Sequence, residues 1–315
     1  MGKQDQIKAK PPAPKHLLLS RRHKQQRVTF LDILLTAALI GLAVYFVYRV
    51  RVRLHYNWNW DVIPQYLFRF DEAKGRMVPN LLVDGFLTTI KLSIWASVIA
   101  VIVGTIMGVL RVGKGIFSRV FSRSYVELVR NLPPLVLVFI FYFFFSSQIL
   151  TALGLDDAIR RISPAGAKVL SVLFVPPPRF SAFIAAVFTL GLYEGAYITE
   201  IIRAGIESVE KGQWEAAYAL GLSPYRKMRH VILPQAGRKI LPPLAGQFIS
   251  TIKDSAIVSV ISIQELTFEG MELMSATHFT FEIWLTITAM YFIITLACSV
   301  AVLRLERRLR KKVAD

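Results

Sequence analysis

Residues Gln213–Pro243 read QWEAAYALGLSPYRKMRHVILPQAGRKILPP and form a polar, basic island between two long apolar segments. The stretch predicts a short amphipathic helix, a break at Ser223-Pro224, a second short basic helix and a proline-marked return to apolar sequence. Ala216 and Ala217 allow close helix packing, and Gly221 is suited to end the first helix. No catalytic set lies within the stretch, so we interpret it as a surface that another protein holds.

The composition on either side of this island is that of a polytopic membrane protein. The chain has 315 residues, is 54% hydrophobic, and contains several apolar runs long enough to cross a bilayer. Its single cysteine, Cys298, excludes an intrachain disulfide and a thiolate metal cluster. The five histidines have no metal-ligand spacing, and no Ser/His/Asp or Cys/His set is visible. We therefore expect neither a catalytic site nor a bound metal.

The net charge of +17 is distributed in clusters that flank the apolar runs. This placement is the positive-inside pattern of cytoplasmic loops, so we expect contact with anionic membrane lipid and no binding of nucleic acid. The polar segment before the first apolar run is too long for the n-region of a signal peptide. The same charge pattern places both termini and the opening island on the cytoplasmic side.

The apolar runs predict an all-α fold with six transmembrane helices: Phe30–Tyr48, Gly85–Val112, Tyr125–Leu150, Phe180–Ile206, Ile240–Ile263 and Phe281–Leu303. The predicted layout has a basic, disordered cytoplasmic tail at 1–29, a first helix at 30–48 and an external or interfacial segment at 49–84. The main transmembrane domain covers 85–304 and includes a cytoplasmic loop at 207–239. Residues 305–315 form a second basic cytoplasmic tail.

Local patterns within the spans predict particular contacts. Gly104 and Gly108 have the small-xxx-small spacing that lets a second helix approach closely. Pro133-Pro134 predicts a broken or kinked entry into the third span. The acidic segment Glu265–Glu272 is expected outside, where it is either a solvated loop or a contact for a partner protein.

The island carries a family resemblance. Glu215-Ala216-Ala217, Gly221 and Leu233-Pro234 resemble the EAA loop of binding-protein-dependent ABC importer permeases, with Val231 where isoleucine is more usual. Leu192–Val209, Tyr125–Phe143 and Thr251–Leu266 are similar to the polar amino acid branch, which includes histidine, glutamine, arginine and general amino acid permeases. Two departures are Arg130-Asn131-Leu132-Pro133-Pro134, in place of Arg-Gly-Thr-Pro-Leu, and Glu194, where a small or hydroxyl residue is commoner.

The resemblance implies a permease subunit of the bacterial inner membrane that imports polar L-amino acids. It implies a five-helix core, to which the first predicted helix is an addition. The implied partners are an ABC ATPase dimer that binds ATP and magnesium, a second permease subunit and an extracytoplasmic amino-acid-binding protein. No cofactor is expected in this chain: Gly108–Gly115 nearly matches a phosphate loop but lacks the final Ser or Thr and follows a membrane helix. The resemblance assigns ATPase coupling to Glu215, Ala216, Ala217, Gly221, Leu233 and Pro234.

Polar residues inside the spans are candidates for the substrate path. Charged side chains in mid-membrane cost on the order of 2.5–3.5 kcal/mol, so they should face a cavity or the protein interior. On the fourth span, Glu200 fits a structural pair with Arg203 better than a functional role. For the others, a path lining and a structural ion network both remain open: Tyr193, Glu194, Tyr197, Arg130, Asn131, Lys253, Asp254 and Ser255.

Two other function classes fit the same residues. A channel or secondary transporter driven by an ion gradient could use Glu194, Lys253 and Asp254 as a relay. A membrane enzyme is a third class, which the missing catalytic set disfavours. Transport that needs ATP and a partner ATPase would separate the importer from both.

Overall fold

A computed structural model describes residues 30–53, 56–73 and 75–314 of the chain. The chain divides into two compact units, Met1–Trp58 and Asn59–Asp315. The first contains helix α1 (Phe30–Arg53), whose side chains are exposed up to residue 49. Its apolar length is sufficient to cross a membrane, as predicted for the first span. The predicted basic tail at 1–29 lies outside the described residues.

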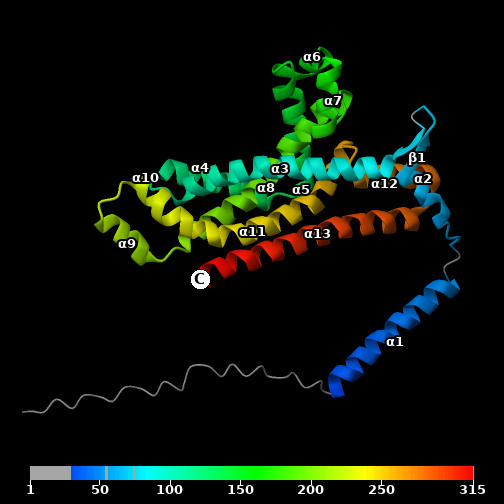
Figure 1. The fold of residues 1–315 in the computed structure, drawn as a ribbon, viewed down its shortest axis with the longest axis horizontal. Helices are drawn as coiled ribbons and strands as arrows, with labels where there is room; N and C mark the ends of the chain where they lie inside the picture. The colour runs from blue at the N-terminus through cyan, green and yellow to red at the C-terminus, as the bar shows by residue number, and fades with distance from the viewer. Residues whose placement is uncertain (1–29, 54–55, 74, 315) are drawn as a thin grey trace, which may run out of the picture. The chain divides into compact units, whose positions relative to one another are not determined.

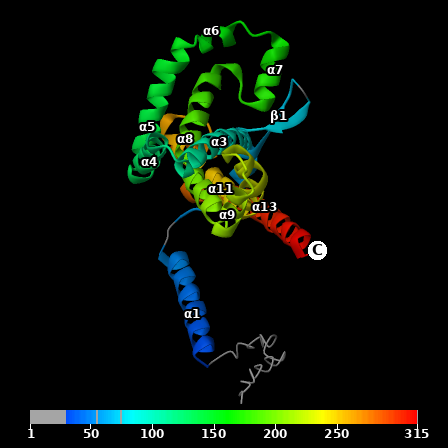
Figure 2. The same ribbon diagram turned by 90° about the vertical axis from the view of Figure 1, so that its left-hand side faces the viewer.

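Two long helices, α3 (Leu81–Val112) and α8 (Phe180–Glu207), lie along each other in the second unit (Figures 1 and 2). Gly104 and Gly108 of α3 make this close packing possible, as their spacing predicts. A Cβ atom at Gly104 would lie 2.5 Å from Cγ2 of Ile198 on α8, which is closer than real Cβ atoms approach. A Cβ atom at Gly108, one turn further along α3, would lie 2.7 Å from Cβ of Ile202 on α8.

The predicted third span is two helices with a sharp bend between them. Helix α4 (Ile116–Asn131) and the segment that begins with α5 (Pro134–Phe144) meet at 118°. Pro133 and Pro134 lie at the bend, where they lack the N–H groups that would continue the α4 hydrogen bonds. A π-helical turn, Phe145–Leu150, completes the segment. The predicted break at Pro133-Pro134 is confirmed.

Short helices fill the connections between the long ones. Between α5 and α8 lie α6 (Leu155–Arg160), α7 (Pro164–Leu173) and the 3-10 turn Pro177–Arg179. After α8 come α9 (Lys211–Ala219), α10 (Pro224–Lys227) and a π-helical turn at Met228–Ile232. The rest of the unit is α11 (Leu233–Asp254), the 3-10 helix η6 (Ser255–Ile261), α12 (Leu266–Thr277) and α13 (Thr280–Ala314). Within the predicted tail at 305–315, the described residues 305–314 continue the backbone of α13.

The segment predicted as external or interfacial contains the one departure from an all-α fold among the described residues. A 3-10 turn (Trp60–Val62) and α2 (Ile63–Leu67) lead into an antiparallel hairpin of β1 (Phe68–Asp71) and β2 (Arg76–Pro79). Gly75 has φ +58°, a conformation that L side chains rarely adopt, and this permits the turn. The all-α prediction is wrong at this hairpin.

Five described helices are long and apolar enough to cross a membrane, and a sixth crossing results if the bent α4–α5 pair is one span. The five are Phe30–Arg49, Leu81–Val112, Pro177–Glu207, Pro224–Ile261 and Thr280–Arg304. Each overlaps one of the predicted spans. The chain is therefore a mostly helical membrane protein. The number of membrane spans is five without the bent α4–α5 pair and six, as predicted, if that pair is one span.

Candidate coupling surface and substrate path

Helix α9 presents an exposed face at one end of the second unit (Figure 1). Glu215 and Ala216 are exposed, whereas Ala217 is buried against the bundle. Gly221 has φ +67° and ends the helix, with its N–H donating to the carbonyl of Tyr218. The predicted two-helix arrangement is confirmed, and its first helix has one buried and one exposed side.

The attachments of α9 hold it firmly to α8 and α11. Trp214 packs against the apolar cluster that contains Ile206 and Ile240, and Lys227 of α10 lies over its ring. Nε2 of Gln235 donates to Oε1 of Gln213 at 3.0 Å. Movement of the exposed face would therefore be transmitted to both long helices.

The predicted helix cap Ser223 and the predicted coupling residues Leu233 and Pro234 follow α9 in the chain. Ser223 caps α10 by accepting from the N–H of Arg226, as its position before Pro224 predicts. Leu233 and Pro234 form the first turn of α11. Leu233 is exposed to 39%, so it remains available at the surface. The structure places all the predicted coupling residues in this loop and its junction with α11.

Two tyrosines of α8 and one arginine of α4 form a polar group in the bundle. The hydroxyl oxygens of Tyr193 and Tyr197 are 3.2 Å apart, so one donates to the other. The guanidinium carbon of Arg130 lies 5.4 Å from the centre of the Tyr197 ring, within cation–π distance. Tyr193 and Tyr197 therefore lie on one face of α8, and Arg130 approaches that face.

Glu194 is fully buried between α8 and α11. Its Oε2 accepts from Nε2 of Gln247 at 2.6 Å. Asp254 and Thr251 of α11 lie close enough to affect the same carboxyl group. Among the described residues, nothing donates a hydrogen bond to Glu194 Oε1, although that oxygen is buried. A buried acceptor without a partner is costly, so this oxygen is ready to receive a donor.

The polar residues at the junction of α11 and η6 differ in how far they are buried. Ser255 is buried and donates to the carbonyl of Ile252 at 2.8 Å. Lys253 is exposed and makes no ion pair with any described residue. Asp254 lies near Glu194 of α8. A structural ion network, one of the two alternatives for Lys253, therefore has no ion pair to support it among the described residues.

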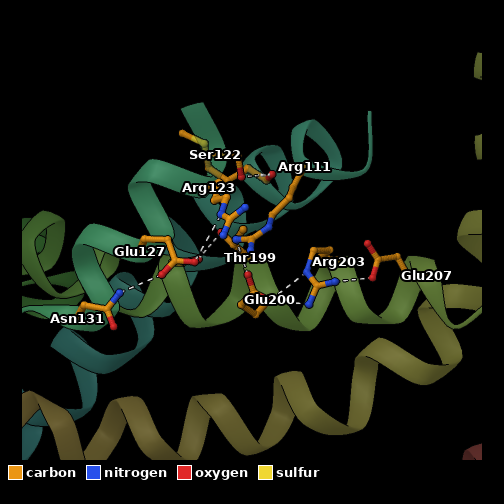
Figure 3. A network of polar contacts seen from close by, with 11 residues as sticks. Arg111, Ser122, Arg123, Glu127, Asn131, Thr199, Glu200, Arg203 and Glu207 are labelled. Atoms are coloured by element: carbon orange, nitrogen blue, oxygen red, sulfur yellow. Dashed lines mark hydrogen bonds and ion pairs between the residues drawn. The ribbon is translucent and has the colours of Figure 1, made fainter. Parts of the chain in front are cut away.

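Glu200 belongs to an ion-pair network, shown in Figure 3. Its carboxylate lies 2.5 Å from Nη1 of Arg111 on α3 and 2.8 Å from Nη2 of Arg203 on its own helix. Arg203 also pairs with Glu207. The pair of Glu200 with Arg203 that the sequence favours is present, and Arg111 adds a link between α3 and α8.

A polar cavity of about 380 Å³ lies beside this network. Its lining comes from α3, α4 and α8 and carries both signs of charge: Arg111, Val126, Glu127, Arg130, Asn131 and Glu200. Nδ2 of Asn131 donates to Oε2 of Glu127 at 3.0 Å. Arg111 and Glu127 were not predicted here. The four-residue spacing of Glu127 and Asn131 on one helix face was the available signal.

The segment predicted to be an acidic outer loop is largely buried. Glu265 caps α12 through the N–H of Phe268, and Tyr291 donates to it at 2.8 Å. Glu269 is exposed to only 3%. Burial raises the pKa of both groups, that of Glu269 to about 7. The reading as a solvated loop is wrong for these two residues, and Glu272 is the exposed carboxylate of the three.

The sequence is similar to a family of membrane transport proteins. Residues 100–313 match the family described as binding-protein-dependent transport system inner membrane component. The glutamine transport system permease protein GlnP of Escherichia coli K12 is 36% identical over 234 residues, covering 73% of this chain and 93% of GlnP. The glutamate/aspartate import permease protein GltK of E. coli O6:H1 is 30% identical over 244 residues, covering 77% of this chain and 99% of GltK.

A solved structure shares the arrangement of the second unit. It is a crystal structure of an amino acid ABC transporter with histidines, with a TM-score of 0.57 and 35% sequence identity. The match covers 72% of this chain and 94% of that one. The resemblance therefore extends from sequence motifs to the packing of the helices.

Proposed function

The chain belongs to the family of binding-protein-dependent transport system inner membrane components, and we propose that it is the permease subunit of an ATP-driven importer of polar L-amino acids. The similar permeases carry glutamine and glutamate/aspartate in their names, which supports a polar amino acid as the solute. The solute passes through the chain and is not chemically changed.

The observation that carries this proposal is the exposed, firmly attached helix α9. Glu215 and Ala216 lie on its exposed side, while Ala217 is buried and Trp214 and Gln213 attach the helix to the bundle. We infer that an ATPase subunit docks here. When the ATPase dimer binds ATP and magnesium and closes, it pulls α9, and the attached helices move between outward and inward access.

The candidate substrate site is the group around Glu194. Its buried Oε1 has no donor among the described residues, and the ammonium group of an amino acid would supply one. Arg130, beside Tyr197, would attract the α-carboxylate. Gln247 orients Glu194 from α11, and Asp254 adds negative charge nearby. The ammonium and carboxylate groups of a zwitterionic solute would therefore each have a group of opposite charge on this chain.

The assembly that we propose contains further subunits. A second permease, identical or homologous, encloses the path with this chain, and an extracytoplasmic binding protein delivers the solute. We place the protein in the bacterial cytoplasmic membrane with both termini and α9 inside, counting the bent α4–α5 pair as one of six spans. The basic residues of α10 and its neighbours, such as Arg226 and Lys227, support this orientation.

Transport in proteoliposomes tests the proposal. The full complex, with its ATPase enclosed together with ATP, should accumulate labelled glutamine or glutamate against a gradient, and omission of ATP should abolish uptake. An ionophore that collapses ion gradients should leave the ATP-driven uptake unchanged. Uptake that continues without ATP and stops with the ionophore would favour the secondary transporter instead.

A further inference from the structure

A second cavity, of about 360 Å³, opens where α3 ends, α4 begins and α8 ends. It is at the same end of the unit as α9 (Figure 1). Its polar lining consists of four arginines and one glutamate: Arg111, Arg119, Arg123, Arg203 and Glu207. The lining therefore carries a net positive charge, which favours an anion in the cavity.

The four arginines differ in how well they are neutralised within the chain. Arg111 and Arg203 are held by Glu200 in the network of Figure 3. Arg123 approaches Glu127 only to 3.7 Å, and 73% of its side chain is exposed. Arg119 makes no ion pair with any described residue. The guanidinium of Arg119 is therefore available to an external group, and that of Arg123 is held only by one long, exposed ion pair.

The rest of the cavity wall is apolar. Ile116 and Val120 of α4 line it, and both are more than half exposed. Phe117 and Phe121 on the same helix are also exposed and stack with their ring centres 6.3 Å apart. A charged cavity beside an exposed apolar helix face suits an amphiphile with an anionic head and apolar chains.

We propose that this cavity binds a phosphate group, with Arg119 and Arg123 as its principal ligands. Guanidinium forks match phosphate oxygens in bidentate geometry, and two arginines can share one phosphate. The phosphate could belong to an anionic phospholipid or be free in solution, and the apolar wall favours the lipid. The site is distinct from the region around Glu194 and does not depend on which solute crosses the membrane.

Lipid binding by the full complex tests this site. Purified complexes in nanodiscs of phosphatidylcholine are titrated with phosphatidylglycerol, and bound lipid is counted by native mass spectrometry. The double variant Arg119→Gln/Arg123→Gln should bind phosphatidylglycerol roughly 30-fold more weakly, because each basic residue near a membrane surface contributes about 1 kcal/mol. The matched control is Arg160→Gln/Arg161→Gln, which removes two exposed charges on and beside α6 and should bind like the wild type.

Two further measurements distinguish the source of the phosphate. Equilibrium dialysis of the wild-type complex with labelled inorganic phosphate should show weak binding. If the wild type binds phosphate tightly and the Arg119→Gln/Arg123→Gln variant does not, the site belongs to free phosphate. Equal lipid and phosphate binding by wild type and variant would overturn the proposal. Loss of the ATPase subunit from the variant, with unchanged lipid binding, would instead make the cavity a protein contact and would also overturn it.

Discussion

The face of α9 and the group around Glu194 contain residues of similar chemistry in opposite settings. Glu215 on α9 is exposed, and its helix is defined by residues within a short stretch of sequence. Glu194 is fully buried, and its partner Gln247 is 53 residues away along the chain. In the function we propose, the first region is a local surface that another protein covers, and the second is a long-range assembly that binds a small solute.

This difference has an energetic consequence. A charge on an exposed helix costs little in this chain alone, so its value depends on the partner that covers it. A buried carboxyl group costs several kcal/mol unless it is paired. We therefore expect changes on α9 to alter coupling without altering the fold, and changes at Glu194 to alter both recognition of the solute and the local packing.

Glu215→Lys should have the largest effect. Reversal of a charge at a docked protein surface costs several kcal/mol, so we expect ATP-driven uptake to fall by more than about tenfold. Stability of the permease should be unchanged because Glu215 makes no described intramolecular ion pair. Uptake in proteoliposomes and the amount of ATPase retained on purification measure the effect.

Glu210→Lys is the matched control for that change. Glu210 is exposed, carries the same charge and stands just before α9, where its side chain makes no capping hydrogen bond. It should retain most of the wild-type uptake. Similar losses for the two variants would mean that general charge, rather than the α9 face, governs docking.

Glu194→Gln tests the buried member of the comparison. It keeps the shape of the side chain but removes the charge that would meet an ammonium group. Uptake of cationic amino acids should fall about tenfold or more, because a hydrogen bond to a charged group contributes about 1.5–3 kcal/mol. Uptake of neutral amino acids, which carry the same α-ammonium group, should also fall, but by less, because they lack the second positive charge that a cationic side chain brings near the carboxylate. ATPase retention should stay at the wild-type level.

Glu207→Gln provides the control on the same helix. Glu207 is exposed to 51% and pairs with Arg203, away from Gln247. It should affect cationic and neutral solutes equally and weakly. If Glu194→Gln is as weak as this control for both kinds of solute, then Glu194 is a structural residue, and the substrate site must lie elsewhere.

The same contrast explains what the sequence could predict. The turn at Gly221, the cap at Ser223 and the bend at Pro133 depend on local backbone chemistry, and each is present in the structure. The close packing at Gly104 followed from residue spacing on one helix. Such features can be predicted from local sequence, without knowing which helix packs against them.

Contacts between distant segments were much less predictable. Glu269 lies in a polar stretch, yet packing buries it, and no local pattern distinguishes it from the exposed Glu272. Similarly, the pairing of Arg111 with Glu200 depends on how α3 and α8 align, although both residues were visible in the sequence. The hairpin at Phe68–Asp71 was missed because its strands are short and aromatic, which also suits an interfacial segment.

Gly104→Ala tests whether the close contact of α3 and α8 supports the group around Glu194. The added Cβ would overlap Ile198, and overpacking of this kind costs about 1–3 kcal/mol. We expect a lower Tm in detergent and weaker uptake. Gly246→Ala on α11 is the control, since no atom lies within 4 Å of a Cβ there, and its Tm should be equal or higher. Equal Tm changes would show that the contact is not tight.

The smallest expected effect is a pH dependence of stability that comes from the Glu269 carboxyl group. Glu269 is buried but lies on α12, outside the candidate spans. Burial, and secondly the charge of Glu272, raise its pKa from 4.5 to about 7, with Asp84 and Glu265 contributing and Arg179 opposing. Between these pH values the folded protein keeps a proton that the unfolded chain has lost. Its contribution to the free energy of unfolding therefore falls as pH rises.

Glu269→Gln removes this titration, so the decline of Tm between pH 5 and pH 8 should become shallower. The variant should resemble the wild type near pH 5 and exceed it by about 2–4 °C near pH 8 for each kcal/mol recovered. Glu272→Gln removes only the neighbouring charge and should produce a smaller change in the same direction. A Tm difference between variant and wild type that does not change with pH would show that the pKa of Glu269 is not raised, and would contradict this prediction.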